Sequence, residues 1–372
     1  LDSGRYILAI SQSGNIAVAD GQPTQRLAAG FTRAAPSGFG GRLSFLSVDI
    51  FNVDDAYELA DANVPVVPPD SNRFLKFRNE VSPAHRETEA SANAYYAVID
   101  PSNSKTTLAA WKTINHFDTG DDASAIYVND ADLGFGRHMH VKSNGDDFAS
   151  YVENYSANVL DPTDPGAGSI DEKVANAHNA TNLLATVAMD YSAHPSDPNN
   201  RRFTKFYVFD ANGDRINKID LDGRGAKYVP GACNVCHGGN PTPLDQDGLY
   251  PDFGNTGAGF LPWDLDVLGF STTVVNGQYT RKNQEAELRQ MNQAILNTNP
   301  TATTRDLVEG WYGGAGLPNA TYNGQYVPLG WQSEPKYYLD VYGPNCRACH
   351  IMRNEAVDFS SSTEFHAFDL DP

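Results

Sequence analysis

The sequence predicts an α+β fold, with a strand-rich part over residues 1–229 and a loop-rich, mainly helical part over residues 230–372. Apolar and polar residues alternate in several stretches of the first part, and turn-forming residues bound these stretches. Beyond residue 280 apolar residues recur at helical spacing instead. A passage rich in Gly, Pro and Asp begins directly after His237, and loops of such length usually serve a function or contact a ligand.

The first part should form strands and one short helix. Alternating apolar residues predict strands at 6–10, 16–18, 42–53 and 92–100. Good helix formers between residues 107 and 117 place Leu108 and Trp111 on one side, which predicts a helix there.

A second strand pair is expected over residues 202–223, with its turn at Asp210 to Asp214. The turn residues also resemble the start of a calcium-binding loop. However, Arg215 stands where an EF-hand requires glycine, and its last ligand position holds no glutamate. Asn212-Gly213 is a common hairpin turn, so the hairpin is favoured over calcium.

Three helices are expected near the C-terminus. Leu288, Met291 and Ile295 share one face of a helix over 283–296. A second helix is predicted over 303–312, with Thr304 as its cap. A third should run through part of 334–350, where it would deliver a cysteine motif.

Bulk composition limits the classes of partner. Lys and Arg total 27 against 46 Asp and Glu, a formal net charge of −19. This charge argues against nucleic acid and anionic membranes as partners and favours proteins with basic surfaces. No apolar run is long enough for a membrane span. The first residues lack the pattern of a secretory signal, so any such signal has been removed.

All four cysteines belong to two Cys-x-x-Cys-His motifs, at 233–237 and 346–350. This pattern is typical of covalent haem c attachment. We therefore expect two haem c groups, with thioethers at Cys233, Cys236, Cys346 and Cys349 and with His237 and His350 as proximal iron ligands. A four-cysteine zinc site needs no histidine after each pair, and a redox dithiol or a disulfide explains the repeated motif less well. Covalent haem attachment implies export, to the periplasm or the cell exterior.

The ligand on the far side of each iron decides between electron transfer and reactivity. In an extended "FGRHMHVK" segment, His138 and His140 would project to one side and Met139 to the other. His138 and His140 are the predicted distal ligands, with Met139 and His366 in reserve; the alternative is a solvated polar strand. Arg347 is a candidate partner for haem propionates, although an ordinary surface arginine explains it equally well.

The strings "DLGFGRHMHVK", "IDLDGRG" and "ACNVCHGGNP" resemble a group of exported bacterial dihaem c-type cytochromes. The resemblance implies a pattern of Arg137, Met139 and His140, which favours His140 over His138. The chain is also similar in general kind to extracellular multihaem cytochromes that form filaments, which implies other copies of the chain as partners.

Electron transfer by a dihaem cytochrome is the function expected from these motifs, and no catalytic group accompanies them. The alternatives are a peroxidase-like or oxygenase-like enzyme with one open iron, and a binding or structural protein that haem merely stabilises.

Overall fold

The computed structural model describes residues 16–17, 31–32, 88–129, 133–157, 168–222, 225–273, 277–352 and 358–367. The chain divides into two compact units, 1–68 and 69–372. In the first unit, β1 (Ile16–Ala17) pairs antiparallel with β2 (Phe31–Thr32). The strands predicted at 6–10 and 42–53 lie outside the described residues.

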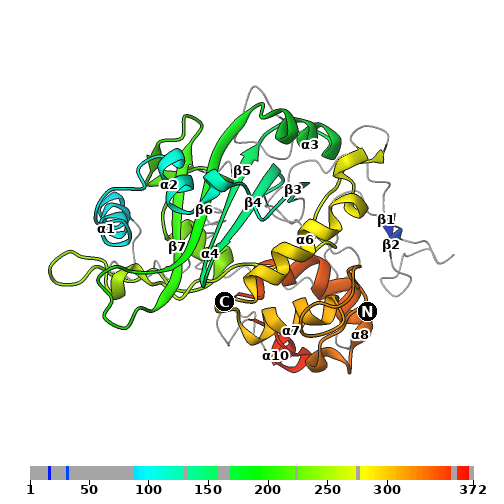
Figure 1. The fold of residues 1–372 in the computed structure, drawn as a ribbon. Coiled ribbons are helices and arrows are strands. Elements are labelled where there is room, and N and C mark those ends of the chain that lie inside the picture. The colour runs from blue at the N-terminus through cyan, green and yellow to red at the C-terminus, as the bar shows by residue number, and fades with distance from the viewer. Residues whose placement is uncertain are drawn as a thin grey trace, which may run out of the picture. The chain divides into compact units, whose positions relative to one another are not determined.

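An antiparallel sheet of six strands in sequential order forms the centre of the second unit (Figure 1). Its strands are β3 (Ala123–Val128), β4 (Gly136–Asn144), β5 (Asp147–Tyr155), β6 (Leu183–Ala193), β7 (Arg202–Asp210) and β8 (Arg215–Ile216). Both faces are largely covered, because seven consecutive residues of β7 are buried. Together with the later helices, this sheet gives the α+β class that the sequence predicts.

Three helices pack on the sheet: the second and third cover one face, which we call the outer face, and the first lies at the edge of β7, where its Tyr95 and Tyr96 hydroxyls accept hydrogen bonds from backbone N–H groups. They are α1 (Glu89–Ile99), α2 (Leu108–Ile114) and α3 (Ile170–Asn179). Trp111 of α2 packs its ring against Tyr151 and Tyr207 of the sheet. Val174 and Ala177 of α3 pack with Ile126 and Tyr155. Figure 1 shows α1 and α2 beside β7, with α3 beside β4 and β5.

The strand predicted at 92–100 is wrong, because this segment is helix α1. Thr88 and Ser91 form a reciprocal capping box at its start. Ala92, Tyr95, Tyr96 and Ile99 are buried at the spacing of one helix face. The β-propensity of the two tyrosines is therefore overridden by the cap and by packing on the sheet.

Two other predictions for this part are confirmed. The helix expected at 107–117 is α2, capped by the side chain of Thr107. Strands β7 and β8 form the expected hairpin, with Phe209 opposite Arg215. The Asp210 carboxylate accepts hydrogen bonds from the backbone N–H groups of Asn212 and Asp214, so it stabilises the turn.

The C-terminal part packs against the opposite face, which we call the inner face. It begins after β9 (Lys218–Ile219) and β10 (Lys227–Tyr228), which pair antiparallel, and contains α4 (Gly231–His237), α6 (Arg281–Ile295), α7 (Ala302–Trp311) and α10 (Ser362–Ala367). Short 3-10 turns η4 (Phe117–Thr119), η5 (Asp252–Gly254), η6 (Gly277–Tyr279) and η7 (Leu329–Trp331) lie between other elements. No helix in the described part of the chain has the length and apolar character needed to cross a membrane.

The predicted C-terminal helices exist, with one correction. Leu288, Met291 and Ile295 are fully buried on α6, as expected. The cap of α7 is Thr301 rather than Thr304, because the side chain of Thr301 accepts the hydrogen bond from the backbone N–H of Thr304. The third helix is continuous through α8 (Pro335–Tyr337), the π-helical η8 (Tyr338–Arg347) and α9 (Ala348–His350).

Candidate functional site

A cavity between the inner face of the sheet and the C-terminal part is the main candidate site. Its volume is about 170 Å³, below the range of about 300–1,000 Å³ that is common for ligand pockets. Cys233, Cys236 and His237 all line it. Most of its remaining wall is apolar, and includes Val152, Val187, Val208, Phe260 and Trp263. The first cysteine motif therefore lies in a mostly apolar cavity.

Helix α4 presents the first motif to this cavity. The Pro230 carbonyl accepts hydrogen bonds from the backbone N–H groups of Cys233 and Asn234, which starts the turn. The buried Asn234 amide donates to the Gly238 carbonyl and to Thr256 Oγ1, which fixes the end of the helix. Because Cys233 and Cys236 are three residues apart on this short helix, their side chains project from the same side.

His237 is buried, and its ring orientation is fixed from one side. Its Nδ1 donates to the Gly259 carbonyl at 3.0 Å, so the other nitrogen, Nε2, carries the lone pair of the neutral ring. Burial lowers the pKa of His237 to about 4, with a smaller contribution from the charge of Arg137. The ring of Phe206 on β7 lies 5.5 Å away. Near neutral pH, His237 is therefore an uncharged imidazole with one nitrogen available to a metal.

The second motif lies close to the first. Helix α9 packs against α4. Gly238 has φ +71°, and a Cβ there would lie 1.8 Å from the Met352 carbonyl oxygen. The backbone just after His237 therefore touches the backbone just after His350 so closely that only glycine fits.

The second motif contributes Arg347, Ala348 and Ile351 to the cavity wall. Cys346 is half-buried, and the His350 ring stacks on Phe359 at 4.7 Å. The side chain of Cys349 lies outside the described part of the structure. His366, on α10, pairs with Glu334 at 3.0 Å and lies beside the rings of Phe365 and Tyr337.

Two arginines line the cavity. Arg347 is almost fully buried, and its guanidinium contacts Asp264 at 2.7 and 2.8 Å and the hydroxyl of Tyr338 at 3.2 Å. Although burial alone lowers the pKa of Arg347, the charge of Asp264 outweighs it and raises that pKa. Arg347 is thus a buried member of an ion pair rather than an exposed arginine. Arg137 reaches the cavity from β4.

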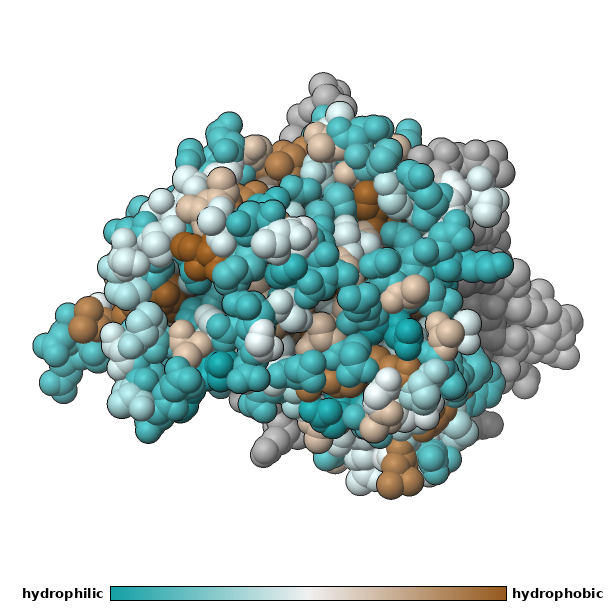
Figure 2. All heavy atoms as spheres, viewed as in Figure 1, coloured by the Kyte–Doolittle hydropathy of each residue, from teal (hydrophilic) through white to brown (hydrophobic). Residues whose placement is uncertain are grey.

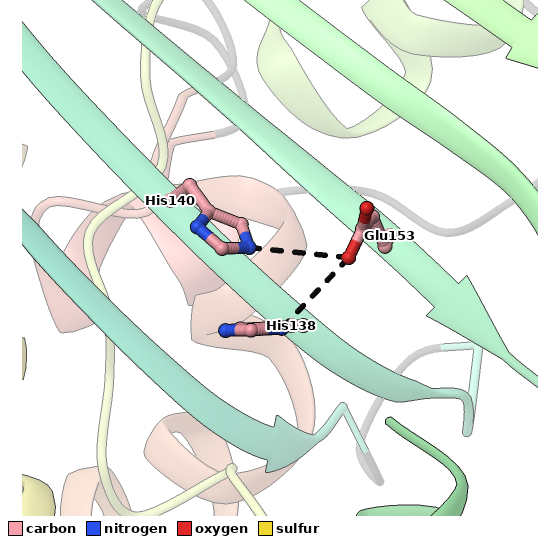
Figure 3. A group of neighbouring side chains, drawn as sticks. All are labelled: His138, His140 and Glu153. Carbon is pink, nitrogen blue, oxygen red and sulfur yellow. Dashed lines mark ion pairs between the residues drawn. The ribbon is translucent and has the colours of Figure 1, made fainter. Parts of the chain in front are cut away.

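The predicted distal-ligand segment is extended, as expected, and its side chains alternate between the two faces. Met139 and Arg137 line the cavity on the inner face. His138 and His140 project to the outer face, where Figure 3 shows them beside Glu153. The structure therefore brings Met139 into the cavity of His237, and brings His138 and His140 together elsewhere.

Sequence reasoning missed several residues of these two places. Met189 is a buried core residue that also lines the cavity, which no local pattern around it indicates. Asp264, the partner of Arg347, had no recognisable signal in its loop. Glu153 could have been found from the Gly145-Asp146 turn, which pairs β4 with β5 and sets His138 opposite Glu153.

Comparison of the chain with protein-family models, with curated proteins and with solved structures finds no match.

Proposed function

We propose that the chain is a dihaem c-type cytochrome of the periplasm or the cell exterior that transfers electrons. One haem is held by Cys233, Cys236 and His237, and the other by Cys346, Cys349 and His350. The observation that carries the proposal is the first motif, whose two thiols and neutral imidazole line one mostly apolar cavity. When bound, haem supplies an iron that cycles between two oxidation states.

The residues present fit haem better than the zinc alternative. A four-cysteine zinc site requires the sulfur atoms to converge on one point. Such a site gives no role to the histidine that follows each cysteine pair, whereas haem c attachment uses both histidines. The hydrogen bond from His237 Nδ1 to a carbonyl is the usual partner arrangement of a metal-binding histidine.

Met139 is the best candidate for the far side of the first iron, because it lines the cavity of His237. Met189, also in that cavity, is the second. For the second iron, His366 stays the candidate, because Phe365 and Phe359 connect its ring to that of His350. Arg137 and Arg347 are the candidate propionate partners in the cavity, and Asp264 holds Arg347 in place.

Charge supports the choice of partner. The net charge of −19 favours a redox protein with a basic surface. Hydrophilic residues predominate on the face shown in Figure 2, where hydrophobic residues form small separate groups. Recognition by charge suits such a surface better than a broad apolar contact.

The test is haem stoichiometry after expression with a c-type haem maturation system. We expect two covalent haems per chain by mass spectrometry and by haem absorption. Replacing Cys233 and Cys236 with serine should remove one haem, and the matched Cys346 and Cys349 double variant should remove the other. If either double variant lost all bound metal and haem never attached, a shared zinc site would replace the proposal. Binding of carbon monoxide to one iron would favour the enzyme alternative over a pure electron carrier.

A further inference from the structure

Three metal-ligating side chains converge on the outer face of the sheet, away from the cavity. His138 and Glu153 are directly opposite each other in the β4–β5 pair, and His140 is two residues further along β4. Glu153 Oε2 lies 3.8 Å from His138 Nδ1 and 3.9 Å from His140 Nε2. Figure 3 shows both rings turned toward this carboxylate. The three ligand atoms all lie within 4.8 Å of one another.

Each imidazole has a hydrogen-bond partner on the nitrogen that faces away from Glu153. His140 Nδ1 lies 2.7 Å from Asp121 Oδ2, and a carboxylate can only accept, so Nδ1 carries the proton. His138 Nε2 lies 2.9 Å from Ser124 Oγ. The lone pair of neutral His140 therefore lies on Nε2 and faces the Glu153 carboxylate, and the lone pair of His138 Nδ1 does so when His138 Nε2 donates to the Ser124 hydroxyl.

Glu153 Oε2 accepts one hydrogen bond, from the Tyr155 hydroxyl at 2.9 Å, and a cation between the three groups would compensate the negative charge of the carboxylate. The two nitrogen-to-oxygen separations are too long for hydrogen bonds. His140 Nε2 is buried and has no hydrogen-bond partner among the described residues. A cation at the centre of the three atoms satisfies all of them at once.

The spacing suits a small divalent ion. Two bonds of about 2.1 Å span at most roughly 4.2 Å, so the separations of 3.8 and 3.9 Å are within reach. Small rotations of the Glu153 side chain and of the two imidazole rings bring the three ligand atoms closer to one another. Two imidazoles with one carboxylate favour a transition-metal ion over calcium or magnesium, which prefer oxygen ligands only.

The surroundings hold the ligands in place and leave one side accessible. Asp121 orients His140 as carboxylates commonly orient metal-binding histidines. The ring of Tyr151 stacks on His140 at 4.3 Å with an interplanar angle of 7°. The side chains of His138 and Glu153 keep 29% and 21% of their exposure, so water or a small ligand can reach the centre.

We propose that His138, His140 and Glu153 bind one divalent transition-metal ion of the zinc or ferrous class, with Asp121 as the positioning residue of His140. Three protein ligands leave coordination positions open, as in catalytic rather than structural sites. This site is separate from the haem cavity and does not depend on the proposed function.

The test uses the full chain with its covalent cofactors, cleared of loosely held ions with a chelator. Zn²⁺ is added at neutral pH against a chromophoric competitor and, separately, by calorimetry. One ion should bind per chain and should raise the unfolding temperature. Co²⁺ in place of Zn²⁺ should give visible bands that change when His138 is replaced with alanine.

Variants identify the ligands. His140→Ala and Glu153→Gln should each weaken Zn²⁺ binding at least about 100-fold, and Asp121→Asn about 10–100-fold. Glu153→Gln keeps the size of the side chain, and circular dichroism checks that it folds. His116→Ala is the matched control, because His116 is exposed and lies outside this group; it should leave the affinity unchanged.

Three results overturn the proposal. Equal Zn²⁺ affinity in the unchanged chain and in Glu153→Gln removes the site. If no Zn²⁺ binds and His140 carries a proton on both nitrogens at neutral pH, the group is an imidazolium held between Asp121 and Glu153. If His140→Ala changes the spectrum of either haem, His140 is a ligand of a haem iron instead.

Discussion

The two faces of strand β4 carry two different sets of side chains within four consecutive residues. On the inner face, Arg137 and Met139 border a cavity of thiols and apolar side chains. On the outer face, His138 and His140 meet the carboxylates of Glu153 and Asp121. A thioether suits haem iron, whereas imidazole with carboxylate suits a zinc-like ion. A shift of one residue in the pairing register would exchange the two sets, so the register of β4 decides which chemistry lies on which face.

Two substitutions at neighbouring positions of β4 test the difference between its two faces, and their expected effect is the largest. Met139→Ala should change the absorption and paramagnetic resonance spectra of one haem, because it removes the sulfur that lines the cavity of His237. His140→Ala should change neither haem, because its ring lies on the outer face. Met189→Ala tests in the same way whether the sulfur of Met189, which also lines the cavity, contributes to that haem spectrum. The reverse outcome, with His140→Ala altering a haem, would restore the distal ligand that the sequence predicts.

Each face of the sheet also buries an ion pair, and breaking either should have a large effect on stability. On the outer face, Asp190 pairs with Lys105 at 2.7 Å and with Lys205 at 3.6 Å. On the inner side, Asp264 pairs with Arg347. Asp190→Asn and Asp264→Asn each leave a buried cation without its partner, which costs about 3–5 kcal/mol. Denaturant unfolding measures both, and losses below about 1 kcal/mol would show that the cations find other partners.

The outer pair should also give an acid-sensitive stability. Burial tends to raise the pKa of Asp190, but the charges of Lys105 and Lys205 outweigh it and lower the pKa from 3.8 to about 2. A carboxyl with a lowered pKa stabilises the fold fully above its unfolded value, and this contribution disappears as the pH falls from near 4 through 2. At roughly 1.4 kcal/mol for each pH unit between the two pKa values, it amounts to about 2 kcal/mol. Asp190→Asn should remove this part of the pH dependence of unfolding.

A smaller effect tests the contact between the two motifs. Gly238→Ala places a methyl group against the Met352 carbonyl, and it also forces alanine into the positive φ that glycine adopts there. Gly248 has a similar φ of +75° but open space around it, so Gly248→Ala isolates the backbone term, which is about 1–2 kcal/mol. Gly238→Ala should therefore destabilise the chain more than its control and alter the spectra of both haems. Equal losses in the two variants would mean that the motifs are not in close contact.

The last comparison concerns the side of the sheet where α6 meets β3. The Gln284 amide donates to the Ile126 carbonyl at 2.7 Å and accepts from the Ile126 N–H. Gln284→Ala should cost about 1–3 kcal/mol, because it leaves buried backbone groups without partners. Gln290→Ala, which removes one exposed hydrogen bond to the Asp122 carbonyl, should cost less. A larger loss in Gln290→Ala would contradict this ranking.

The sequence predicts the α+β class because alternation and helical spacing are local signals. The same alternation places Met139 opposite to His138 and His140. Which of these faces meets the cavity is set by long-range packing, such as that of Phe206 against His237, and no local pattern contains it. The misassigned strand at 92–100 has the same origin, because Tyr95 and Tyr96 favour strands until the Thr88 cap and the sheet surface select a helix.

Contacts between side chains that lie far apart in the sequence could not be predicted from local patterns either. The Cys-x-x-Cys-His spacing points to haem by its chemistry alone, so Cys233, Cys236 and His237 are predicted to bind haem without any knowledge of the fold. Asp264 reaches Arg347 from a loop 83 residues away. Only the folded chain brings these two together.

The contact of Gln284 with Ile126 has a consequence for how copies of this chain can associate. β3 is the outermost strand of the sheet, and such a strand normally offers its free backbone groups to a strand of another molecule. Here Ile126 is bonded by Gln284, and Val128 exchanges two hydrogen bonds with Gly269. A second copy cannot extend the sheet at these positions without displacing both. Any filament of this chain that uses this side must therefore be joined through side chains and not through a continuous intermolecular sheet.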